Sequence, residues 1–228
     1  MCSSDLGWEL AAAWLPAREV AGDYYDFISL EMTPDQAQKL GLVIADVADK
    51  GTPAALFMVN VRSTLRASMF DADSPVHGLT HVNQLVCADS HDGMFVTLFY
   101  AQINSMDGVV TYVNAGHNPP FLLRASDEEP ELLTRTGMAL GVDPSVMFTQ
   151  HAVTLEAGDF ILFYTDGVPD ALNDAGQEFG EDRLRELALA HRGDSAMGMV
   201  STIEATLKAH IGETPPFDDI TLMALKRL

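Results

Sequence analysis

The chain has few cysteines, few basic residues and no long apolar run. Its 228 residues include only Cys2 and Cys87, which are too few for a disulfide framework and fit a reducing compartment. Lysine and arginine number 13 against 33 acidic residues, which gives a formal net charge of -20 at pH 7. Such a field repels nucleic-acid phosphates and anionic membrane surfaces, and no apolar run approaches the roughly 20 residues of a membrane helix. We therefore expect a cytoplasmic protein that contacts neither nucleic acid nor membrane.

Several catalytic sequence motifs are also absent. The chain has no Gly-x-Ser-x-Gly turn, and Lys50-Gly51-Thr52 is in the wrong order for a phosphate-binding Walker loop. His77 and His81 have the i, i+4 spacing of a helical zinc site but lack the glutamate of a zinc-protease motif. Serine-hydrolase, P-loop and zinc-protease chemistry are therefore disfavoured.

The hydrophobic pattern contains many strands and two pairs of helices. Period-two or continuous apolar runs predict strands, and apolar residues at helical spacing predict helices. The predicted strands cover residues 8–14, 42–46, 95–103, 109–113, 121–123, 152–155, 160–164 and 220–225, with another running toward Leu30. The predicted helices cover residues 53–69, 76–88, 180–192 and 196–211. This order predicts a single α+β domain in which antiparallel sheets pack on each other with helices outside.

Four aspartates stand where a strand pattern ends or in the turn beside one, namely Asp23, Asp46, Asp166 and Asp218. The setting of Asp46 is typical of a site residue, because it ends the apolar run 42–45 and precedes the turn at 49–51. Thr52 can cap the helix that follows, with Pro53 at its first position. An aspartate beside a strand can also be a simple turn former, and that alternative stays open for each residue alone.

Four convergent carboxylates would need a cation. Two carboxylates 4–5 Å apart repel by about 1 kcal/mol in water and several-fold more in a partly buried site. Hard divalent ions such as Mg²⁺ or Mn²⁺ relieve this repulsion through oxygen ligands. Two such ions about 3.5–4 Å apart can hold a bridging hydroxide and a phosphoryl group. The acids therefore suggest metal-dependent phosphoryl chemistry.

Six motifs occur in order along the chain and cover about residues 8 to 226. They are Arg-x-Val-x-Gly-Asp-x-Tyr-Asp (18–26), Ala-Asp-Val-x-x-Lys-Gly-x-Pro-Ala-Ala-Leu (45–56), Phe-Val-Thr-Leu-Phe-Tyr (95–100), Asn-Ala-Gly-His-Asn-Pro-Pro (114–120), Tyr-Thr-Asp-Gly-Val (164–168) and Asp-Asp-Ile-Thr-Leu (218–222). Together they resemble the SpoIIE-type serine phosphatases, the bacterial branch of the metal-dependent protein phosphatase (PPM, protein phosphatase 2C-like) superfamily. The resemblance implies an α-β-β-α sandwich of two mainly antiparallel sheets flanked by helices. It also implies two Mn²⁺ or Mg²⁺ ions in the cleft between the sheets.

The resemblance further implies a role for each matching ligand position. Asp46 bridges the two ions, and Val47 contributes its backbone carbonyl. Asp23 binds one ion, while Asp166 and Asp218 hold the other.

Three positions keep two interpretations each. Asp218 fits the family pattern better than Asp219, but the doubled acid leaves Asp219 as an alternative ligand. Arg18 lies where the superfamily places a phosphate-binding arginine, or it forms a salt bridge with Asp26. His117 is either a base or a hydrogen-bonded structural residue.

We predict a metal-dependent protein serine/threonine phosphatase with Asp46, Asp23, Asp166 and Arg18 as catalytic residues. By the resemblance, a hydroxide that bridges the two ions attacks phosphorus in line, with no phosphoenzyme. The substrate implied is a phosphoserine or phosphothreonine on a small regulatory protein, such as an anti-sigma factor antagonist. Ala48 stands where the wider superfamily has a general-acid histidine, so the leaving group takes its proton from metal-bound water or an unassigned group.

Two other functional classes stay open. One is a catalytically silent module that only binds phosphoprotein, which the intact set of ligand acids disfavours. The other is a metal phosphohydrolase of small molecules, which a comparison of phosphopeptides with nucleotides would distinguish. Residues 1–228 are expected to form one phosphatase domain of a longer regulatory protein, with a homodimer contact through the helices at 53–88.

Overall fold

The computed structural model describes residues 7–30, 39–70, 72–90, 93–104, 106–125, 127–213 and 216–228. It contains two five-stranded antiparallel sheets. The chain divides into two compact units, each with one sheet. The β3 unit comprises residues 20–117 and 134–154, and the β10 unit comprises residues up to Glu19, 118–133 and 155–228.

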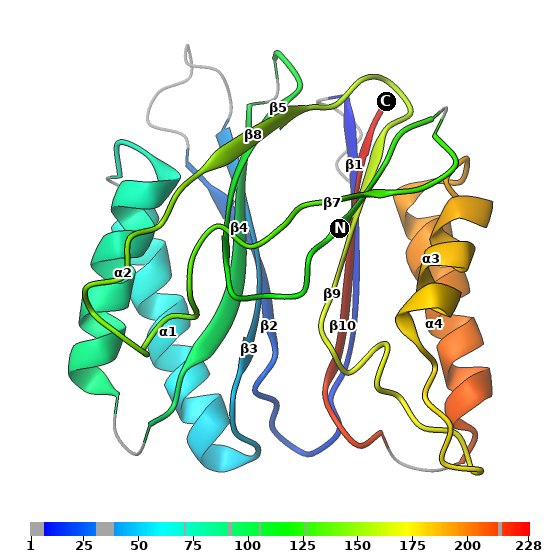
Figure 1. The fold of residues 1–228 in the computed structure, drawn as a ribbon, viewed down its shortest axis with the longest axis horizontal. Coiled ribbons are helices and arrows are strands. Elements are labelled where there is room, and N and C mark those ends of the chain that lie inside the picture. Colours follow the sequence, from blue (N-terminus) through cyan, green and yellow to red (C-terminus); the bar gives the residue numbers. More distant parts are fainter. Residues whose placement is uncertain are drawn as a thin grey trace. The chain divides into compact units, whose positions relative to one another are not determined.

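The sheet of the β3 unit has the strand order β2-β3-β4-β5-β8. Its strands are β2 (Tyr24–Ser29), β3 (Lys39–Val47), β4 (Val96–Asn104), β5 (Val109–Ala115) and β8 (His151–Thr154). Two helices, α1 (Thr52–Phe70) and α2 (Pro75–Asp89), cover one face of this sheet (Figure 1). Leu65 of α1 and Leu79 and Val82 of α2 are fully buried in the core against it. Ser74 caps α2 by accepting a hydrogen bond from His77 N–H, and Pro75 takes the first helical position, where no N–H is needed.

The sheet of the β10 unit has the strand order β1-β10-β9-β6-β7. Its strands are β1 (Trp8–Leu15), β10 (Ile220–Arg227), β9 (Phe160–Tyr164), β6 (Phe121–Leu123) and β7 (Glu131–Leu132). The helices α3 (Glu181–Ala190) and α4 (Ala196–Ile211) cover one face of this sheet (Figure 1). Leu184 of α3 and Ile203 and Leu207 of α4 fill the core beneath them.

The predicted fold class is confirmed by two antiparallel sheets, each covered by a pair of helices. The bounds of α4 match the prediction, and those of the other three helices differ from it by one or two residues at each end. The two-residue strand β7 was missed, because Glu131 and Leu132 are too few for an alternating pattern to appear. Cys2 lies outside the described residues. The expectation of one domain taken from a longer protein stays a prediction.

No helix in the described ranges is both long and apolar enough to span a membrane.

Candidate metal and phosphate site

Two of the predicted ligands, Asp23 and Asp46, are paired by the register of the β3 unit. The antiparallel pairing of β2 with β3 sets Tyr24 opposite Ala45. Continuing this register by one residue sets Asp23 opposite Asp46. Side chains directly opposite each other lie on the same face of a sheet, with Cβ atoms about 4.5–5.5 Å apart.

The face that carries these two acids follows from strand alternation. Val43, Ala45 and Val47 belong to the core packed against α1 and α2. Because successive side chains point to opposite faces, Asp46 lies on the face that these helices leave uncovered. Asp23 is 7% exposed and Asp46 is half-buried. A buried and a half-buried carboxylate on one sheet face form one half of the predicted cation site.

The turn after Asp46 is shaped by hydrogen bonds of its backbone. The amide of Asp49 donates to the carbonyl oxygen of Val47 at 2.7 Å, and the amide of Ala48 donates to Phe95 at 3.0 Å. A carbonyl oxygen has two lone pairs, so the bond from Asp49 is compatible with the predicted ligand role of Val47. Gly51 has a φ of 83°, a left-handed conformation that glycine adopts without strain, and α1 begins at the next residue.

The antiparallel pairing of β9 with β10 places Asp166 and Asp218 at the same end of the sheet of the β10 unit. The register continues past Tyr164 and Leu222, since Thr165 N–H donates to Thr221 O at 3.1 Å and Thr221 N–H donates to Thr165 Oγ1 at 2.9 Å. Both threonines are fully buried. Asp166, which follows Thr165, and Asp218, three residues before Thr221, are both half-buried.

Gly167 allows an unusually close approach beside Asp166. A Cβ atom built on Gly167 would lie 1.9 Å from the carbonyl oxygen of Asp219. Any side chain here would push the 166–167 turn away from the 218–219 segment. The absence of a side chain at Gly167 therefore permits this close approach of the two segments.

The contacts of Asp219 favour Asp218 as the ligand of this doubled acid. The Ala17 amide donates to the Asp219 carboxylate at 2.8 Å, and the Asp219 amide donates to the Asp218 carboxylate at 2.9 Å. Asp219 thus holds the end of β1, while Asp218 is placed by a bond to its own neighbour. Arg18 follows Ala17 directly and is exposed. The same contact therefore keeps Arg18 beside the 218–219 segment.

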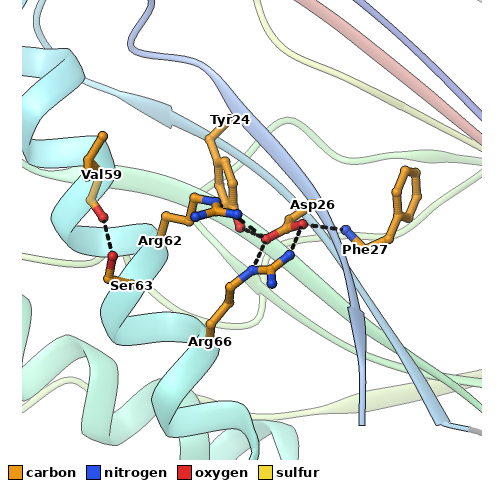
Figure 2. Close-up of polar contacts among 7 residues, drawn as sticks. All are labelled: Tyr24, Asp26, Phe27, Val59, Arg62, Ser63 and Arg66. Carbon is orange, nitrogen blue, oxygen red and sulfur yellow. Dashed lines mark hydrogen bonds and ion pairs between the residues drawn. The ribbon is translucent and has the colours of Figure 1, made fainter.

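The alternative partner of Arg18, Asp26, is already bound within the β3 unit. Figure 2 shows Arg66 of α1 donating from Nε and Nη2 to the Asp26 carboxylate, at 2.5 and 2.6 Å. Arg62 lies 3.7 Å from the same carboxylate, and the Tyr24 hydroxyl donates to it as well. This cluster ties β2 to α1, and it removes the reason for assigning Arg18 to Asp26.

The Asp26 cluster shifts the pKa of both acidic groups in it, the Asp26 carboxyl and the Tyr24 phenol. Burial raises the pKa of the Asp26 carboxyl, but the hydrogen bonds from Arg66 and Tyr24 outweigh burial and bring the pKa below its ordinary value. Burial, together with the neighbouring Asp26 carboxylate, raises the pKa of the Tyr24 phenol. Tyr24 therefore stays a hydrogen-bond donor, and Asp26 stays ionised at neutral pH.

A folded-state pKa below the unfolded value makes Asp26 a source of pH-dependent stability. We expect Asp26→Asn to lower the free energy of unfolding by about 1 kcal/mol at pH 7, because both arginines are more than 40% exposed and solvent screens the pair. The difference from the unsubstituted chain should shrink as the pH falls below about 4, the ordinary aspartate pKa. Urea unfolding at pH 7 and pH 3.5 measures this. An equal loss at both pH values, or a loss of the same size for the exposed Asp73→Asn, would contradict the assignment.

His117 has the contacts of a structural residue. It is 1% exposed, its Nδ1 lies 2.9 Å from Thr97 Oγ1, and its amide donates to the Asn114 side chain at 2.8 Å. Thr97 is opposite Asp46 in the pairing of β3 with β4. Asp46, Thr97 and His117 therefore lie in one region of the sheet. These contacts favour the structural interpretation of His117 over the catalytic base.

Each unit supplies two of the four predicted carboxylates. The β3 unit carries Asp23 and Asp46, and the β10 unit carries Asp166 and Asp218. Over the described parts of the chain, no group of three or more His, Cys, Asp or Glu side chains has a geometry that could hold a metal ion. The donors nevertheless suit Mg²⁺ or Mn²⁺, because they are hard carboxylate oxygens at half-buried strand ends. Their fit is also supported by the glycine that lets the 166 and 218 segments approach.

Comparison with known proteins identifies the family. The family description "Stage II sporulation protein E (SpoIIE)" matches residues 36–228. The chain therefore belongs to the SpoIIE family, and the resemblance seen in the six motifs is confirmed.

Individual relatives agree with this family. The chain is 32% identical to Protein IcfG of Synechocystis, over 96% of the chain and 38% of IcfG. It is 31% identical to the phosphoserine phosphatase RsbU of Bacillus subtilis, over 96% of the chain and 63% of RsbU. The solved RsbU and RsbW domains of Rv1364c from Mycobacterium tuberculosis share 27% identity and a TM-score of 0.77, over 97% of the chain and 60% of that structure. The chain thus spans less than two thirds of these relatives.

Two more distant structures with the same fold hold metal ions. RsbX was solved with magnesium, at a TM-score of 0.71 and 17% identity, with 99% of the chain and 98% of that structure covered. The catalytic domain of the phosphatase PstP was solved with two manganese ions, at a TM-score of 0.67 and 16% identity, with 96% of the chain and 97% of that structure covered. At this identity the likeness concerns the fold, which is that of PP2C-type phosphatases.

Proposed function

We propose that the chain is a metal-dependent protein serine/threonine phosphatase, acting on a phosphorylated regulatory protein such as an anti-sigma factor antagonist. The observation that carries this proposal is the placement of four aspartates at or beside strand ends, two in each unit, in a chain of the SpoIIE family. The name of the relative RsbU, a phosphoserine phosphatase, supports the same activity. The magnesium and manganese found in RsbX and PstP support the dependence on a divalent ion.

In this proposal the ions are held by Asp23, Asp46 with the Val47 carbonyl, Asp166 and Asp218. When bound, two divalent ions would favour ionisation of water near neutral pH and offset charge on the phosphoryl oxygens. The carboxylates fix these ions from rigid strand ends, so little reorganisation accompanies the reaction. The bound ions would in turn offset the repulsion between these carboxylates.

Arg18 is proposed to bind the phosphoryl group. Its backbone is fixed through Ala17 and Asp219, while its side chain is exposed and able to approach a substrate. The reaction adds water to phosphorus, breaks the bond to the serine oxygen, and yields inorganic phosphate and a serine hydroxyl. Ala48 cannot donate a proton, so the leaving oxygen would take one from water or from another group.

The proposal is tested by measuring phosphate release from a phosphoserine peptide with Mn²⁺, with chelator, and with Asp166→Asn. We expect Mn²⁺-dependent release that falls by more than about a hundredfold in the variant, because even residues behind a metal ligand cost 10–100-fold when changed. Asp182→Asn, on α3 and 88% exposed, is the matched control and should keep full activity.

The other outcomes separate the remaining functional classes. Mn²⁺ binding by calorimetry without any phosphate release would indicate a silent phosphoprotein-binding module. Rapid release from nucleotides but not from phosphopeptides would indicate a small-molecule phosphohydrolase. Absence of Mn²⁺ binding would refute the ligand assignment itself. A homodimer through the helices at 53–88 remains a separate prediction, which sedimentation analysis would test.

A further inference from the structure

A pocket of 210 Å³ lies next to the predicted ligand Asp218 in the β10 unit. Asp218 and Gly167, the neighbour of Asp166, both line it. The pocket therefore adjoins both predicted ligands of this unit. An engineered cavity of about 150 Å³ holds benzene, so a pocket of this size has room for one leucine or phenylalanine side chain.

The pocket has apolar as well as acidic lining residues. Leu172, Ile211, Phe217 and Ile220 contribute to its lining. Phe217 is 72% exposed and Leu172 is 39% exposed, although both are large hydrophobic side chains. Covering them with an apolar group would release water from hydrocarbon surface, at about 25 cal/mol per Å² buried. The pocket thus favours an apolar occupant.

Two further acids lie in the wall of the pocket. Asp170 and Glu178 both line it, and none of its lining residues in the described part of the chain is a lysine or arginine. The whole chain carries a formal charge of -20, so its long-range field has the same sign as this wall. A basic residue next to the apolar group of an occupant would therefore be favoured over an acidic one.

The wall that carries Leu172 and Glu178 is held in place by hydrogen bonds. These two residues form a β-bridge, and the Phe179 amide donates to Ala171 O at 2.8 Å. His210 of α4 is within 3.2 Å of the Ala171 and Gln177 carbonyl oxygens through Nε2. Since a carbonyl can only accept, Nε2 donates to both. The pocket is thus built on a braced segment.

We propose that this pocket binds an apolar side chain of the substrate segment that carries the phosphoserine, with a basic residue of the same segment facing Asp170 and Glu178. This inference rests on the proposed phosphatase function and adds a substrate preference to it. Because an extended peptide advances about 3.3 Å per residue, the apolar side chain lies within a few residues of the phosphoserine. The phosphate then reaches the ligands while its neighbour fills the pocket.

The test uses synthetic phosphoserine peptides of Gly, Ser and Lys in which one leucine is moved from three residues before the phosphoserine to three residues after it. One position should raise kcat/KM about tenfold over the leucine-free peptide, mainly through KM, as expected for one hydrophobic contact. Replacing the lysines by glutamates should lower kcat/KM. Fluorescence anisotropy of labelled peptides gives the same comparison as binding.

The variant Leu172→Ser should lose the leucine preference. Leu132→Ser is the matched control, since Leu132 is 44% exposed, lies in the same unit and is outside this pocket. The comparison is a ratio between two peptides for each variant, so a general loss of activity cancels.

Each outcome decides a different claim. Equal kcat/KM for all peptides, or a preference that survives in Leu172→Ser, would overturn the pocket assignment while leaving the phosphatase function intact. If no phosphate is released from any peptide or from p-nitrophenyl phosphate, the proposed function fails. In that case equal anisotropy for the leucine and leucine-free peptides would refute the pocket independently.

Discussion

Gly167→Ala should remove most of the Mn²⁺ affinity of the chain. The alanine methyl would stand 1.9 Å from the Asp219 carbonyl oxygen, a distance that forces the backbone to move. Since the obstructing atom belongs to a backbone between Asp218 and β10, no side-chain rotation can relieve the clash. The 166–167 turn must then separate from the 218–219 segment. We expect a loss of at least about tenfold in Mn²⁺ affinity, and destabilisation of about 1–3 kcal/mol as for an overpacked core.

Calorimetry with Mn²⁺ and urea unfolding of the same samples would measure both effects. The control is Gly193→Ala, because a Cβ atom at Gly193 would meet nothing within 4 Å and its backbone needs no left-handed conformation. That variant should match the unsubstituted chain in both measurements. Normal Mn²⁺ affinity in a folded Gly167→Ala protein would show that the close approach does not serve the ligands.

The sequence predicted the sheets well because several strands are buried on both faces and therefore form continuous apolar runs. In β3, residues 42–47 are apolar on both faces until Asp46, and the structure confirms a strand that ends at Val47. The same pattern identified β9 and β10. It failed for β7, because this strand has only two residues, which pair with β6 and are too few to form a hydrophobic pattern.

The candidate ligands were found from strand ends, but their partners were not. Asp26 and Arg66 are 40 residues apart, and nothing local in either segment indicates that a carboxylate on β2 faces an arginine on α1. Arg62 and Arg66 are four residues apart, which places them on one face of a helix. The sequence does not indicate that Asp26 is the acid that both of them contact. Likewise, only the fold shows that the Asp219 carboxylate accepts a hydrogen bond from the Ala17 amide. This contact distinguishes the role of Asp219 from that of Asp218.

The pocket beside Asp218 was also beyond the reach of sequence reasoning. Leu172 and Phe217 come from two loops that are far apart in the chain and become neighbours through β9, β10 and α4. Phe217 directly precedes the predicted ligand Asp218 in the sequence, but its exposure is visible only in the structure. Its meaning depends on the braced wall opposite it, which only the structure contains.

Asp46→Asn should abolish Mn²⁺-dependent phosphate release while making the metal-free protein more stable. In the absence of metal, Asp23 and Asp46 are like charges in opposite positions of an antiparallel pair, which is a destabilising arrangement. Removing one charge relieves it, by a few tenths of a kcal/mol up to about 1 kcal/mol. With metal the sign reverses, because the unsubstituted chain gains about 2.7 kcal/mol at a metal concentration of 100 times Kd and the variant gains far less.

Urea unfolding of both proteins, once with chelator and once with Mn²⁺, measures this reversal in their stability difference. Phosphate release is measured on the same samples. Asp49→Asn is the matched control, three residues later in the same turn. Its carboxylate is exposed and accepts the Lys50 amide at 2.7 Å, a bond that an asparagine oxygen can keep. It should therefore behave as the unsubstituted chain in both conditions. If Asp46→Asn instead lowered stability in chelator, Asp46 would be a structural turn residue, the alternative that the sequence left open for every strand-end aspartate.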